Sequence, residues 1–445
     1  MKGQRKAIGI GLIGWGTVGC GVIQALRDNA QAIRDRLGVP IELRRVADLD
    51  LDTRRPVAVD RELLTTDVRE ILTAPDIDIV IELIGGLEPA RTFIATALAG
   101  GKHVVTANKA LLAHHGNELF ELARTSDRSI GFEAAVAGGI PLIKSLREGL
   151  AANQVETIFG ILNGTANYIL SRMTTEPGLS FAAALSAAQA QGYAEADPTL
   201  DIEGIDTAHK LAIACAIAFG GPIQFDRVHV EGISGIDPID LRFAEEFGYR
   251  LKLLAIGRHL NGRYEMRVHP TLIPREHVLA SVTGAYNAVH IHGNAVGDIM
   301  LYGLGAGMMP TGSAVLSDVI DLGRDLLSGI QRRVPPLSFL PESQQPLDYQ
   351  PITEVTTRYY FRFSAMDRPG VLSAVAGILG RNRISIAAVI QKGRQVEGTV
   401  PIVMLTHEAR ESDVRRSLEE IDQLQVVQAP TRLLRIEGHD PGDSL

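Results

Sequence analysis

Short apolar runs alternate with longer amphipathic segments over the first 150 residues of the chain. The apolar runs have the length and composition of buried strands, and the segments between them have the spacing of helices. Strands are expected at residues 7–13, 41–47, 77–83, 103–106 and 130–135, and helices at 18–37 and 89–99. This alternation predicts an α/β domain over residues 1–150 that is built on a doubly wound parallel sheet.

The alternation ends near residue 151, and a different pattern runs to residue 310. Residues 180–191 form an alanine-rich helical segment, and residues 205–219 form a helix that is apolar on nearly every side after Lys210 and is expected to be buried. Strand-like runs lie at 157–162, 228–234, 250–257 and 265–273. The pattern predicts an α+β domain with an antiparallel or mixed sheet, and a helix at 311–330 is expected to complete the first domain.

Five prolines between residues 334 and 351 separate this region from the end of the chain. So many prolines exclude a regular element and predict a linker over residues 331–353. The segments that follow have the order βαββαβ, which predicts a ferredoxin-like domain over residues 354–436. They lie at 356–364, 371–382, 384–391, 399–406, 412–424 and 426–435.

The composition narrows the classes of function. The net charge is −8 and no basic face is evident, which argues against a general nucleic-acid binder. The two cysteines, Cys20 and Cys215, lack metal-type spacing and fit a reducing compartment. The first apolar run is broken by glycines, unlike a signal peptide, and no run reaches the ~18 apolar residues of a membrane span. We therefore expect a cytoplasmic protein with no membrane partner.

A glycine-rich loop, GWGTVG at residues 14–19, follows the first predicted strand and opens the first predicted helix. Small residues let the backbone approach a pyrophosphate, whose charge binds the free N–H groups at the helix start. This context predicts a Rossmann-type dinucleotide site, and a tight turn without a ligand is the alternative. The residues expected to contact the cofactor are Gly14, Gly16, Thr17, Val18 and Gly19.

The form of the cofactor stays open at this point. Asp48 ends the second predicted strand and would favour NAD through the ribose hydroxyls, although it follows the loop at a longer spacing than usual. Arg54 and Arg55 lie just beyond it and could meet the 2′-phosphate of NADP.

Two lysines stand where a catalytic crevice is expected. Lys109 follows a strand of the parallel sheet, at the edge where ligands bind, and either projects toward the nicotinamide or is a surface charge. Lys210 shares a helix face with Asp206, and an exposed pair of this kind would be a weak salt bridge. The apolar helix that follows favours a pocket instead. There, burial lowers the pKa of a lysine and an aspartate raises it, as suits a proton carrier.

Five carboxylates crowd the segment YAEADPTLDIEGIDTAHK, residues 193–210. No histidine accompanies them at ligand spacing, which disfavours a metal site. Asp197 and Asp201 are expected to be solvated loop residues or helix caps. Glu195 and Asp206 are the better candidates for holding the ammonium or hydroxyl of a substrate.

Six segments of the chain, spread over residues 11–311 and in the family's order, resemble homoserine dehydrogenase. They are GLIGWGTVG at 11–19, TANKALLA at 106–113, EAAVAGGIP at 133–141, LNGTANYIL at 162–170, GYAEADPTLDIEGIDTAHKL at 192–211 and GLGAGMMPT at 303–311. DRPGVLSAVAGIL at 367–379 resembles the start of an ACT domain, a small-ligand sensor often appended to this family. No kinase-like region precedes the glycine loop, so the monofunctional form is expected.

The resemblance implies the reversible, NAD(P)-dependent interconversion of L-homoserine and L-aspartate 4-semialdehyde, in the biosynthesis of threonine, methionine and isoleucine. It implies that Lys210 exchanges a proton with the substrate hydroxyl and that Lys109 lies beside the nicotinamide. Glu195 and Asp206 would bind the ammonium and hydroxyl ends of the substrate. The residues implied near the cofactor, where a side chain would collide with it, are Gly192 and Gly307.

The resemblance also implies a site for a monovalent cation, Na⁺ or K⁺, formed by Glu133 and the backbone carbonyls of Val136, Gly138 and Ile140. Oxygen ligands on an irregular loop suit a hard cation. The sequence alone, without the resemblance, favours an ordinary loop acid at Glu133.

The C-terminal domain carries an implied regulatory site. Asp367 and Gly370 lie on the turn between its first strand and helix, where the ACT fold binds an amino acid. The family suggests threonine as a feedback inhibitor, and a role in assembly alone is the alternative. An ACT-like edge and the family's habit favour a homodimer or homotetramer.

Two rival functions complete the sequence-based hypotheses. One is another NAD(P)-dependent reductase that acts on a related amino acid or aldehyde. The other is a non-enzymatic sensor of NAD(P) and an amino acid. The two lysines and the acidic segment disfavour the sensor, because it has no need of a proton carrier.

Overall fold

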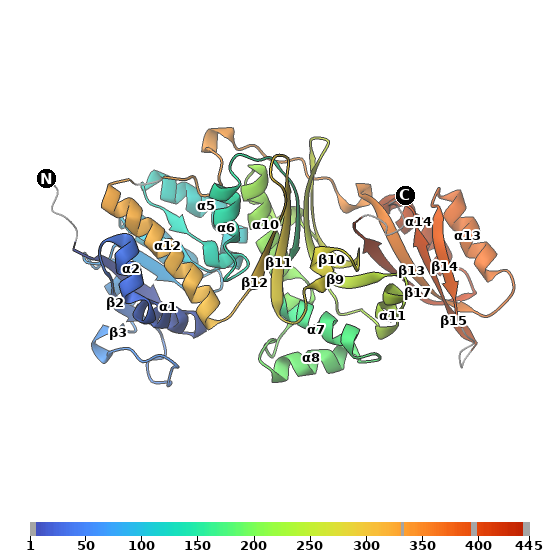
Figure 1. Ribbon diagram of the computed structural model, residues 1–445, viewed down its shortest axis with the longest axis horizontal. Coiled ribbons are helices and arrows are strands. Elements are labelled where there is room, and N and C mark those ends of the chain that lie inside the picture. The colour runs from blue at the N-terminus through green and yellow to red at the C-terminus, as the bar shows by residue number, and fades with distance from the viewer. Residues whose placement is uncertain (1–5, 331–332, 393–397, 439–445) are drawn as a thin grey trace.

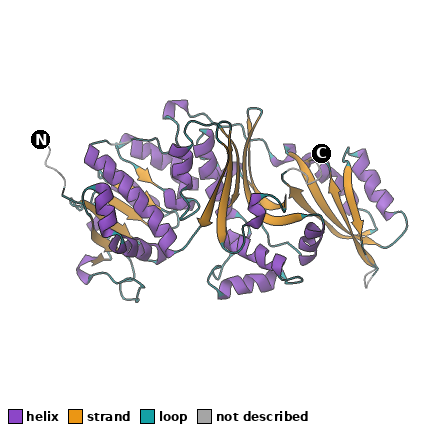
Figure 2. Cartoon of the chain, viewed as in Figure 1, coloured by secondary structure: helices purple, strands orange, loops and turns teal. Residues whose placement is uncertain are grey.

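The N-terminal and C-terminal domains lie at opposite ends of an elongated molecule, with long strands between them (Figure 1). The computed structural model describes residues 6–330, 333–392 and 398–438. Residues 331 and 332, the first two of the predicted linker, lie outside the described residues. Helices surround the N-terminal sheet, whereas strands dominate the centre (Figure 2).

Six strands form the N-terminal sheet in the order β3-β2-β1-β4-β5-β6, and every pair is parallel. The predicted doubly wound parallel sheet is therefore confirmed. The strand order reverses between β1 and β4, and ligands bind outside the carboxyl ends of the strands at such a point. The strands are β1 (Ile8–Ile13), β2 (Ile41–Ala47), β3 (Leu64–Thr65), β4 (Ile79–Glu82), β5 (His103–Thr106) and β6 (Ile130–Gly131).

Two predictions within this domain need correction. The helix expected at 18–37 is two helices, because the chain bends at Asn29, whose Nδ2 bonds back to the Ala25 carbonyl. The strand expected at 130–135 ends at Gly131, because the Glu133 N–H donates to Asp318 of α12 and the chain turns into a 3-10 helix. The helices are α1 (Thr17–Asp28), α2 (Ala30–Leu37), α3 (Arg69–Leu72), α4 (Ala90–Ala99), α5 (Lys109–Thr125) and α12 (Met308–Ser328).

Helix α12, which lies almost 300 residues after α1 in the sequence, packs against α1 with the two backbones in contact. A Cβ atom on Gly21 would lie 1.8 Å from the carbonyl oxygen of Met308, and one on Gly312 would lie 2.5 Å from the carbonyl carbon of Gly21. Glycine is required at both positions, because any side chain would push the helices apart. This contact brings Gly307, just before α12, close to the end of α1 that follows the glycine loop.

Eleven strands form one mixed sheet that spans the centre and the C-terminal domain, with the main order β12-β11-β7-β9-β10-β17-β13-β15-β14. Most pairs are antiparallel, but β17 joins β10 in parallel through Thr271 with Arg435 and Leu272 with Ile436. The strands are β7 (Val155–Ile161), β8 (His229–Val230), β9 (Tyr249–Leu260), β10 (Arg263–Pro274), β11 (Tyr286–Gly293), β12 (Gly297–Leu304), β13 (Thr356–Met366), β14 (Ile386–Gln391), β15 (Thr399–Thr406), β16 (Ala409–Arg410) and β17 (Val427–Ile436).

Buried ion pairs fasten the C-terminal domain to the central sheet. Arg435 of β17 contacts Glu231, in the central region, at 2.8 Å and Glu411, at the start of α14, at 2.6 Å. Arg267 of β10 contacts Glu437 at 2.6 Å. Buried arginines of this kind are stable only when paired, so both sides of the junction depend on each other.

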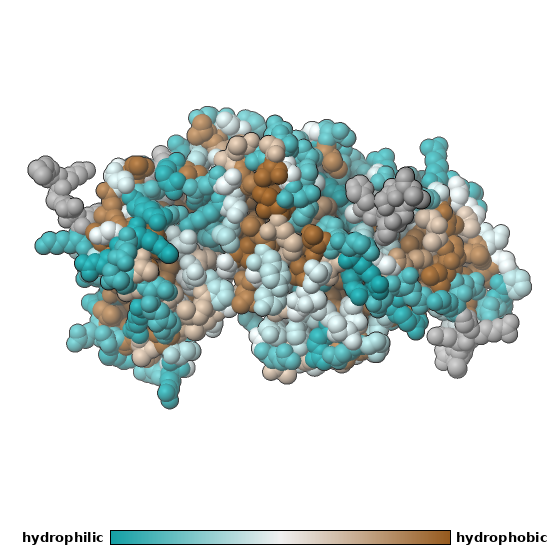
Figure 3. Space-filling model, in the orientation of Figure 1, coloured by the Kyte–Doolittle hydropathy of each residue, from teal (hydrophilic) through white to brown (hydrophobic). Residues whose placement is uncertain are grey.

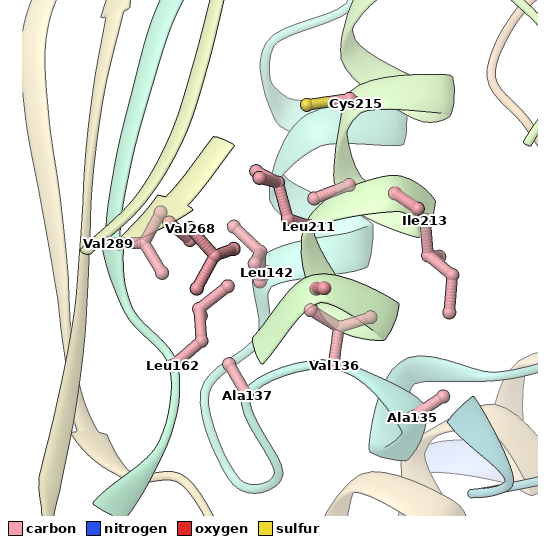
Figure 4. Close-up of a cluster of buried hydrophobic side chains, with 14 of the residues drawn as sticks. Ala135, Val136, Ala137, Leu142, Leu162, Leu211, Ile213, Cys215, Val268 and Val289 are labelled. Atoms are coloured by element: carbon pink, nitrogen blue, oxygen red, sulfur yellow. The ribbon is translucent and has the colours of Figure 1, made fainter. Parts of the chain in front are cut away.

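Helix α10 (Ile205–Phe219) runs through the core and is buried from Asp206 to Phe219, as its apolar pattern predicts. Its side chains Leu211 and Ile213 lie in one apolar cluster with Leu162 and Val136 (Figure 4). The other helices of the centre and C-terminus are α6 (Leu142–Lys144), α7 (Gly164–Thr175), α8 (Phe181–Ala190), α9 (Thr199–Ile202), α11 (Pro238–Glu246), α13 (Val371–Arg381) and α14 (Glu411–Asp422).

The contact between α1 and α12 predicts that Gly21→Ala destabilises the N-terminal domain by about 1–3 kcal/mol, the usual cost of overpacking. Trp15, the one tryptophan of the chain, lies at the start of α1, so its fluorescence during urea unfolding reports on this domain. Gly380→Ala is the matched control, because a Cβ atom there meets nothing within 4 Å. It should leave stability unchanged or raise it by up to about 1 kcal/mol. Equal midpoints for the two variants would contradict the proposed close packing.

Candidate active site

The glycine loop leaves the carboxyl end of β1 and turns directly into α1. Gly14 has a left-handed backbone (φ 104°), and a Cβ atom on it would lie 2.8 Å from the Leu83 carbonyl oxygen. A Cβ atom on Gly19 would lie 2.2 Å from the Gly14 carbonyl oxygen, whereas one on Gly16 would meet nothing. No side chain caps α1, so the N–H groups of its first turn remain available for an anion.

Asp48 lies at this loop rather than free in solvent. Its carboxylate accepts a hydrogen bond from the Trp15 N–H at 2.6 Å, and the Arg55 guanidinium approaches it at 3.7 Å. An acid for ribose hydroxyls and a cation for a 2′-phosphate therefore stand side by side, and the geometry suits either form of the cofactor.

A hydrogen-bond chain at the ends of β4 and β5 holds the start of α5. The Glu82 carboxylate is fully buried and accepts from the Thr106 hydroxyl at 2.7 Å and from the Ile84 N–H at 2.9 Å. The Thr106 hydroxyl accepts from the Asn108 N–H, and the Asn108 side chain caps α5 through the Leu111 N–H. Burial raises the pKa of Glu82. Sequence reasoning missed Glu82, since the end of an apolar strand gives no signal of function.

Lys109 begins α5 and points across the domain boundary at Asp206 of α10. Its Nζ lies 3.2 Å from Asp206 Oδ1, and the other carboxylate oxygen, Oδ2, accepts from Lys210 Nζ at 2.7 Å. Lys210 Nζ also donates to the Leu162 carbonyl at 2.7 Å. The Lys210 side chain is 10% exposed and that of Lys109 is 38% exposed. Two ammonium groups therefore share one buried carboxylate.

The charges of this triad control one another. Burial acts to raise the pKa of Asp206, but the charges of Lys210 and Lys109 outweigh it and hold that pKa well below its usual range. The charge of Asp206 raises the pKa of Lys109, with smaller contributions from Asp201 and Glu195. Asp206 is thus an anion at all physiological pH values, and a proton exchanged here would be carried by a lysine.

The remaining carboxylates of the acidic segment occupy different environments. Glu195 is exposed, in the loop that also holds Gly192, and faces Lys109 closely enough to affect its pKa. Asp197 is exposed and accepts from Thr199 at the start of α9, as expected of a helix cap. Asp201 differs from the solvated residue expected, because it accepts from Asn163 Nδ2 at 2.7 Å and burial raises its pKa.

The loop implied for a cation has an unusual backbone. Ala137 and Gly138 are both left-handed, with φ of 60° and 54°. The Glu133 carboxylate accepts from the Ile143 N–H at 2.8 Å and the Lys144 N–H at 2.9 Å, and burial and Asp318 raise its pKa to about 7. That carboxylate is therefore already engaged. Among the described residues no group of three His, Cys, Asp or Glu side chains is arranged for a metal.

The turn implied as a regulatory site joins β13 to α13. The Asp367 N–H donates to the Gly398 carbonyl at 3.1 Å, and Gly370 precedes α13 with a left-handed backbone (φ 92°). Gly192 and Gly307 are left-handed as well (φ 75° and 120°). A Cβ atom on either would meet no protein atom closer than an ordinary contact. Glycine is therefore required there by the backbone conformation or by a bound group.

A glycine loop at the switch point of a parallel sheet, facing a lysine–aspartate–lysine triad, defines an NAD(P)-dependent oxidoreductase. Comparison with known proteins gives its family. Residues 14–133 match the model for the NAD binding domain of homoserine dehydrogenase, residues 141–320 match that for homoserine dehydrogenase, and residues 359–425 match the ACT domain. The chain belongs to the homoserine dehydrogenase family, which confirms the predicted family.

Individual relatives agree over the full length. The homoserine dehydrogenase of Neisseria gonorrhoeae is 46% identical and covers 98% of this chain and 100% of its own. That of Pseudomonas aeruginosa is 44% identical, covering 97% and 99%. A crystal structure of a homoserine dehydrogenase from Thiobacillus denitrificans has a TM-score of 0.92 at 48% identity, covering 97% and 98%. The chain therefore interconverts L-homoserine and L-aspartate 4-semialdehyde with a nicotinamide cofactor, a step in amino-acid biosynthesis.

Proposed function

We propose that Lys210 exchanges the proton of this reaction and that the Asp206 carboxylate holds it in place. When homoserine is oxidised, a neutral Lys210 amine takes the proton of the substrate hydroxyl while a hydride leaves the carbon that bears this hydroxyl. In the reverse reaction, the Lys210 ammonium returns the proton to the developing alkoxide. Bound NAD(P) supplies or accepts the hydride. The supporting observation is the double anchorage of Lys210 Nζ, by Leu162 and Asp206, in a buried position.

Lys109, Glu195 and Asp206 surround the space beside Lys210 with alternating charge. We assign Glu195 and Asp206 to the ammonium and hydroxyl ends of the substrate, and Lys109 to orienting the reacting oxygen beside the nicotinamide. A small zwitterion would meet opposite charges at both ends, which favours one orientation.

The nucleotide is assigned to the glycine loop, with the pyrophosphate on the first turn of α1. The open space at Gly16 and the uncapped helix start suit that group. Gly192 and Gly307 are assigned to the rim of the cofactor site. A hyperthermophilic archaeal homoserine dehydrogenase mutant, 26% identical with a TM-score of 0.60 and covering 71% of this chain and 97% of its own, was solved in complex with NADPH. We therefore take NADP as well as NAD as candidate cofactors.

The proton role predicts that Lys210→Ala lowers the turnover of aspartate 4-semialdehyde by about 10²–10⁴, the usual contribution of a positioned acid or base. Binding of NADPH, followed by its fluorescence, should persist because the glycine loop is unaffected. Lys392→Ala removes an exposed lysine paired with Glu246 and should leave turnover unchanged. Turnover near the wild-type value in Lys210→Ala, with NADPH still bound, would rule out the proton role.

We propose a Na⁺ or K⁺ site at the loop of residues 133–140. Its ligands would be Glu133 and the backbone carbonyls of Val136, Gly138 and Ile140. The two left-handed residues in succession turn this backbone away from regular pairing, and carbonyl oxygens are the ligands that a hard cation prefers.

The cation site predicts that activity falls when Na⁺ and K⁺ are replaced by choline at constant ionic strength, because the loop beside α10 loses its organising charge. Activity should return on addition of KCl or NaCl but not of further choline chloride. Steady-state rates in salt-exchanged enzyme measure this, and rates that do not respond to the exchange would contradict the site.

We propose that threonine binds at the turn of Asp367 and Gly370 and inhibits the enzyme. The match to an ACT domain supports an amino-acid effector, and the ion pairs of Arg435 give the domain a physical link to the central region. The exposed start of α13 supplies N–H groups for a carboxylate.

The regulatory site predicts that threonine lowers the rate of wild-type enzyme with NADPH and with NADH, and that Asp367→Ala abolishes this inhibition without changing the uninhibited rate. Asp413→Ala, at a half-buried acid of α14 in the same domain, should remain inhibited. Steady-state kinetics with and without threonine measure both. An unresponsive wild-type enzyme would leave the domain with a role in assembly only.

We propose that the chain assembles as a homodimer or homotetramer through its open sheet edges. β12 ends the long sheet on one side and β14 on the other. An apolar area lies over β11 and β12 in the middle of the molecule (Figure 3). Its exposed residues are Tyr286, Val296, Met300, Tyr302 and Leu304. Unpaired edges with apolar faces favour association, and light scattering would detect a monomer if this is wrong.

The protein is proposed to act in the cytoplasm, where its two free, buried cysteines stay reduced. Within the described residues no helix has both the length and the apolar character needed to cross a bilayer. We divide the chain into a nucleotide-binding domain (1–150, completed by 311–330), a catalytic and oligomerisation domain (151–310), a linker (331–353) and a regulatory domain (354–436). Fractionation and limited proteolysis test these assignments.

A further inference from the structure

The side chain of Asn163, at the start of α7, forms hydrogen bonds with two acids of the active site and with one backbone group. Its Oδ1 accepts from the Ala166 N–H at 2.7 Å, which caps α7. Its Nδ2 donates to Asp201 Oδ1 at 2.7 Å and to Asp206 Oδ2 at 2.8 Å. The residue is 5% exposed. Because the capped N–H requires an oxygen, the nitrogen must face the two carboxylates.

From this arrangement we infer that Asn163 is a positioning residue for the dehydrogenase reaction, which holds Asp201 and Asp206 as separate anions and thereby fixes Lys210. The inference rests on the proposed proton role of Lys210. Asp206 Oδ2 receives both the Asn163 amide and the Lys210 ammonium, so the amide determines which way that oxygen faces. The neighbouring residue completes the support, since the Leu162 carbonyl accepts from Lys210 Nζ.

A donor is needed between the acids because two neighbouring carboxylates would otherwise share a proton. Burial and the charge of Asp206 both raise the pKa of Asp201, and the hydrogen bond from Asn163 opposes them. A proton shared by Asp201 and Asp206 would partly neutralise the carboxylate that pairs with Lys109 and Lys210. The amide prevents this, since both of its hydrogens are donated outward.

Charged groups reach this point from several elements. Asp201 comes from α9, Asp206 and Lys210 come from α10, and Lys109 comes from α5. His209 lies on the same helix as Lys210, and burial lowers its pKa to about 4, so it is neutral near pH 7. Asn163 thus stands among two acids and two lysines, and a charge added there acts on all of them.

The test replaces Asn163 by residues that keep the helix cap and lose the amide N–H groups. Serine and aspartate both accept the Ala166 N–H well. Asn163→Ser is expected to lower kcat about tenfold or more while the KM for NADPH changes less than about twofold, because a preorganised donor is lost near the reacting group only. Asn163→Asp should lower kcat similarly.

Ser180→Asp is the matched control, because it makes the same kind of exchange at the cap of α8, where Ser180 accepts from Ala183. Circular dichroism on heating checks that all variants fold. The inference is overturned if either Asn163 variant keeps kcat within about twofold of wild type, or if the KM for NADPH rises as much as kcat falls. Lys210→Ala is measured in parallel: retained turnover there would refute the proton role itself, whereas its loss together with normal Asn163 variants would refute only the positioning role.

Discussion

A single carboxylate, that of Asp206, holds the site together because it forms ion pairs with lysines of two domains. Lys109 reaches it from the nucleotide-binding domain and Lys210 from the buried helix α10. A buried charge is tolerated only when it is paired, and leaving one partner unpaired costs about 3–5 kcal/mol. The position of α5 relative to α10 is therefore coupled to the charge of this carboxylate. The same ion pairs join the N-terminal domain to the buried helix of the central region.

The surroundings of this triad are built in layers. Glu82, Thr106 and Asn108 hold the start of α5, and Asn163 and Leu162 hold the start of α10. Leu162 also belongs to an apolar cluster with Leu211 and Val136 (Figure 4), and a low local dielectric strengthens polar interactions. Polar groups at the crevice are thus supported by backbone caps on one side and packed side chains on the other, which limits the motion of the ammonium groups.

Local sequence patterns were sufficient to predict much of this architecture. The bounds of β2, β5, β15 and α10 coincide with the predicted segments, because each is an uninterrupted apolar or amphipathic run between clear breaks. The sheet class, the glycine loop and the pairing of Asp206 with Lys210 followed from local spacing. The predictions failed where one residue changed the local path, as Asn29 does between α1 and α2.

Long-range contacts account for what the sequence could not supply. Asn163 reads locally as a helix cap, and only the fold brings it to Asp201 and Asp206, which are 38 and 43 residues away. Asp201 was expected in solvent for the same reason. The two hairpin strands β11 and β12 escaped prediction. The exposure of side chains alternates along β12, but its sequence GDIMLYGL has apolar residues on both faces, so polar and apolar residues do not alternate. Nothing local indicates that β17 should join β10.

That last pairing has a consequence for how the chain can be shortened. β17 is both the final strand of the C-terminal domain and the neighbour of β10 in the central sheet, and its Arg435 pairs with Glu231. A chain ending before β17 would lose the backbone pairing at Thr271 and Leu272 and the contacts of Glu231 with Arg435 and of Arg267 with Glu437. A truncation at this point would therefore remove part of the central sheet together with the last strand of the C-terminal domain.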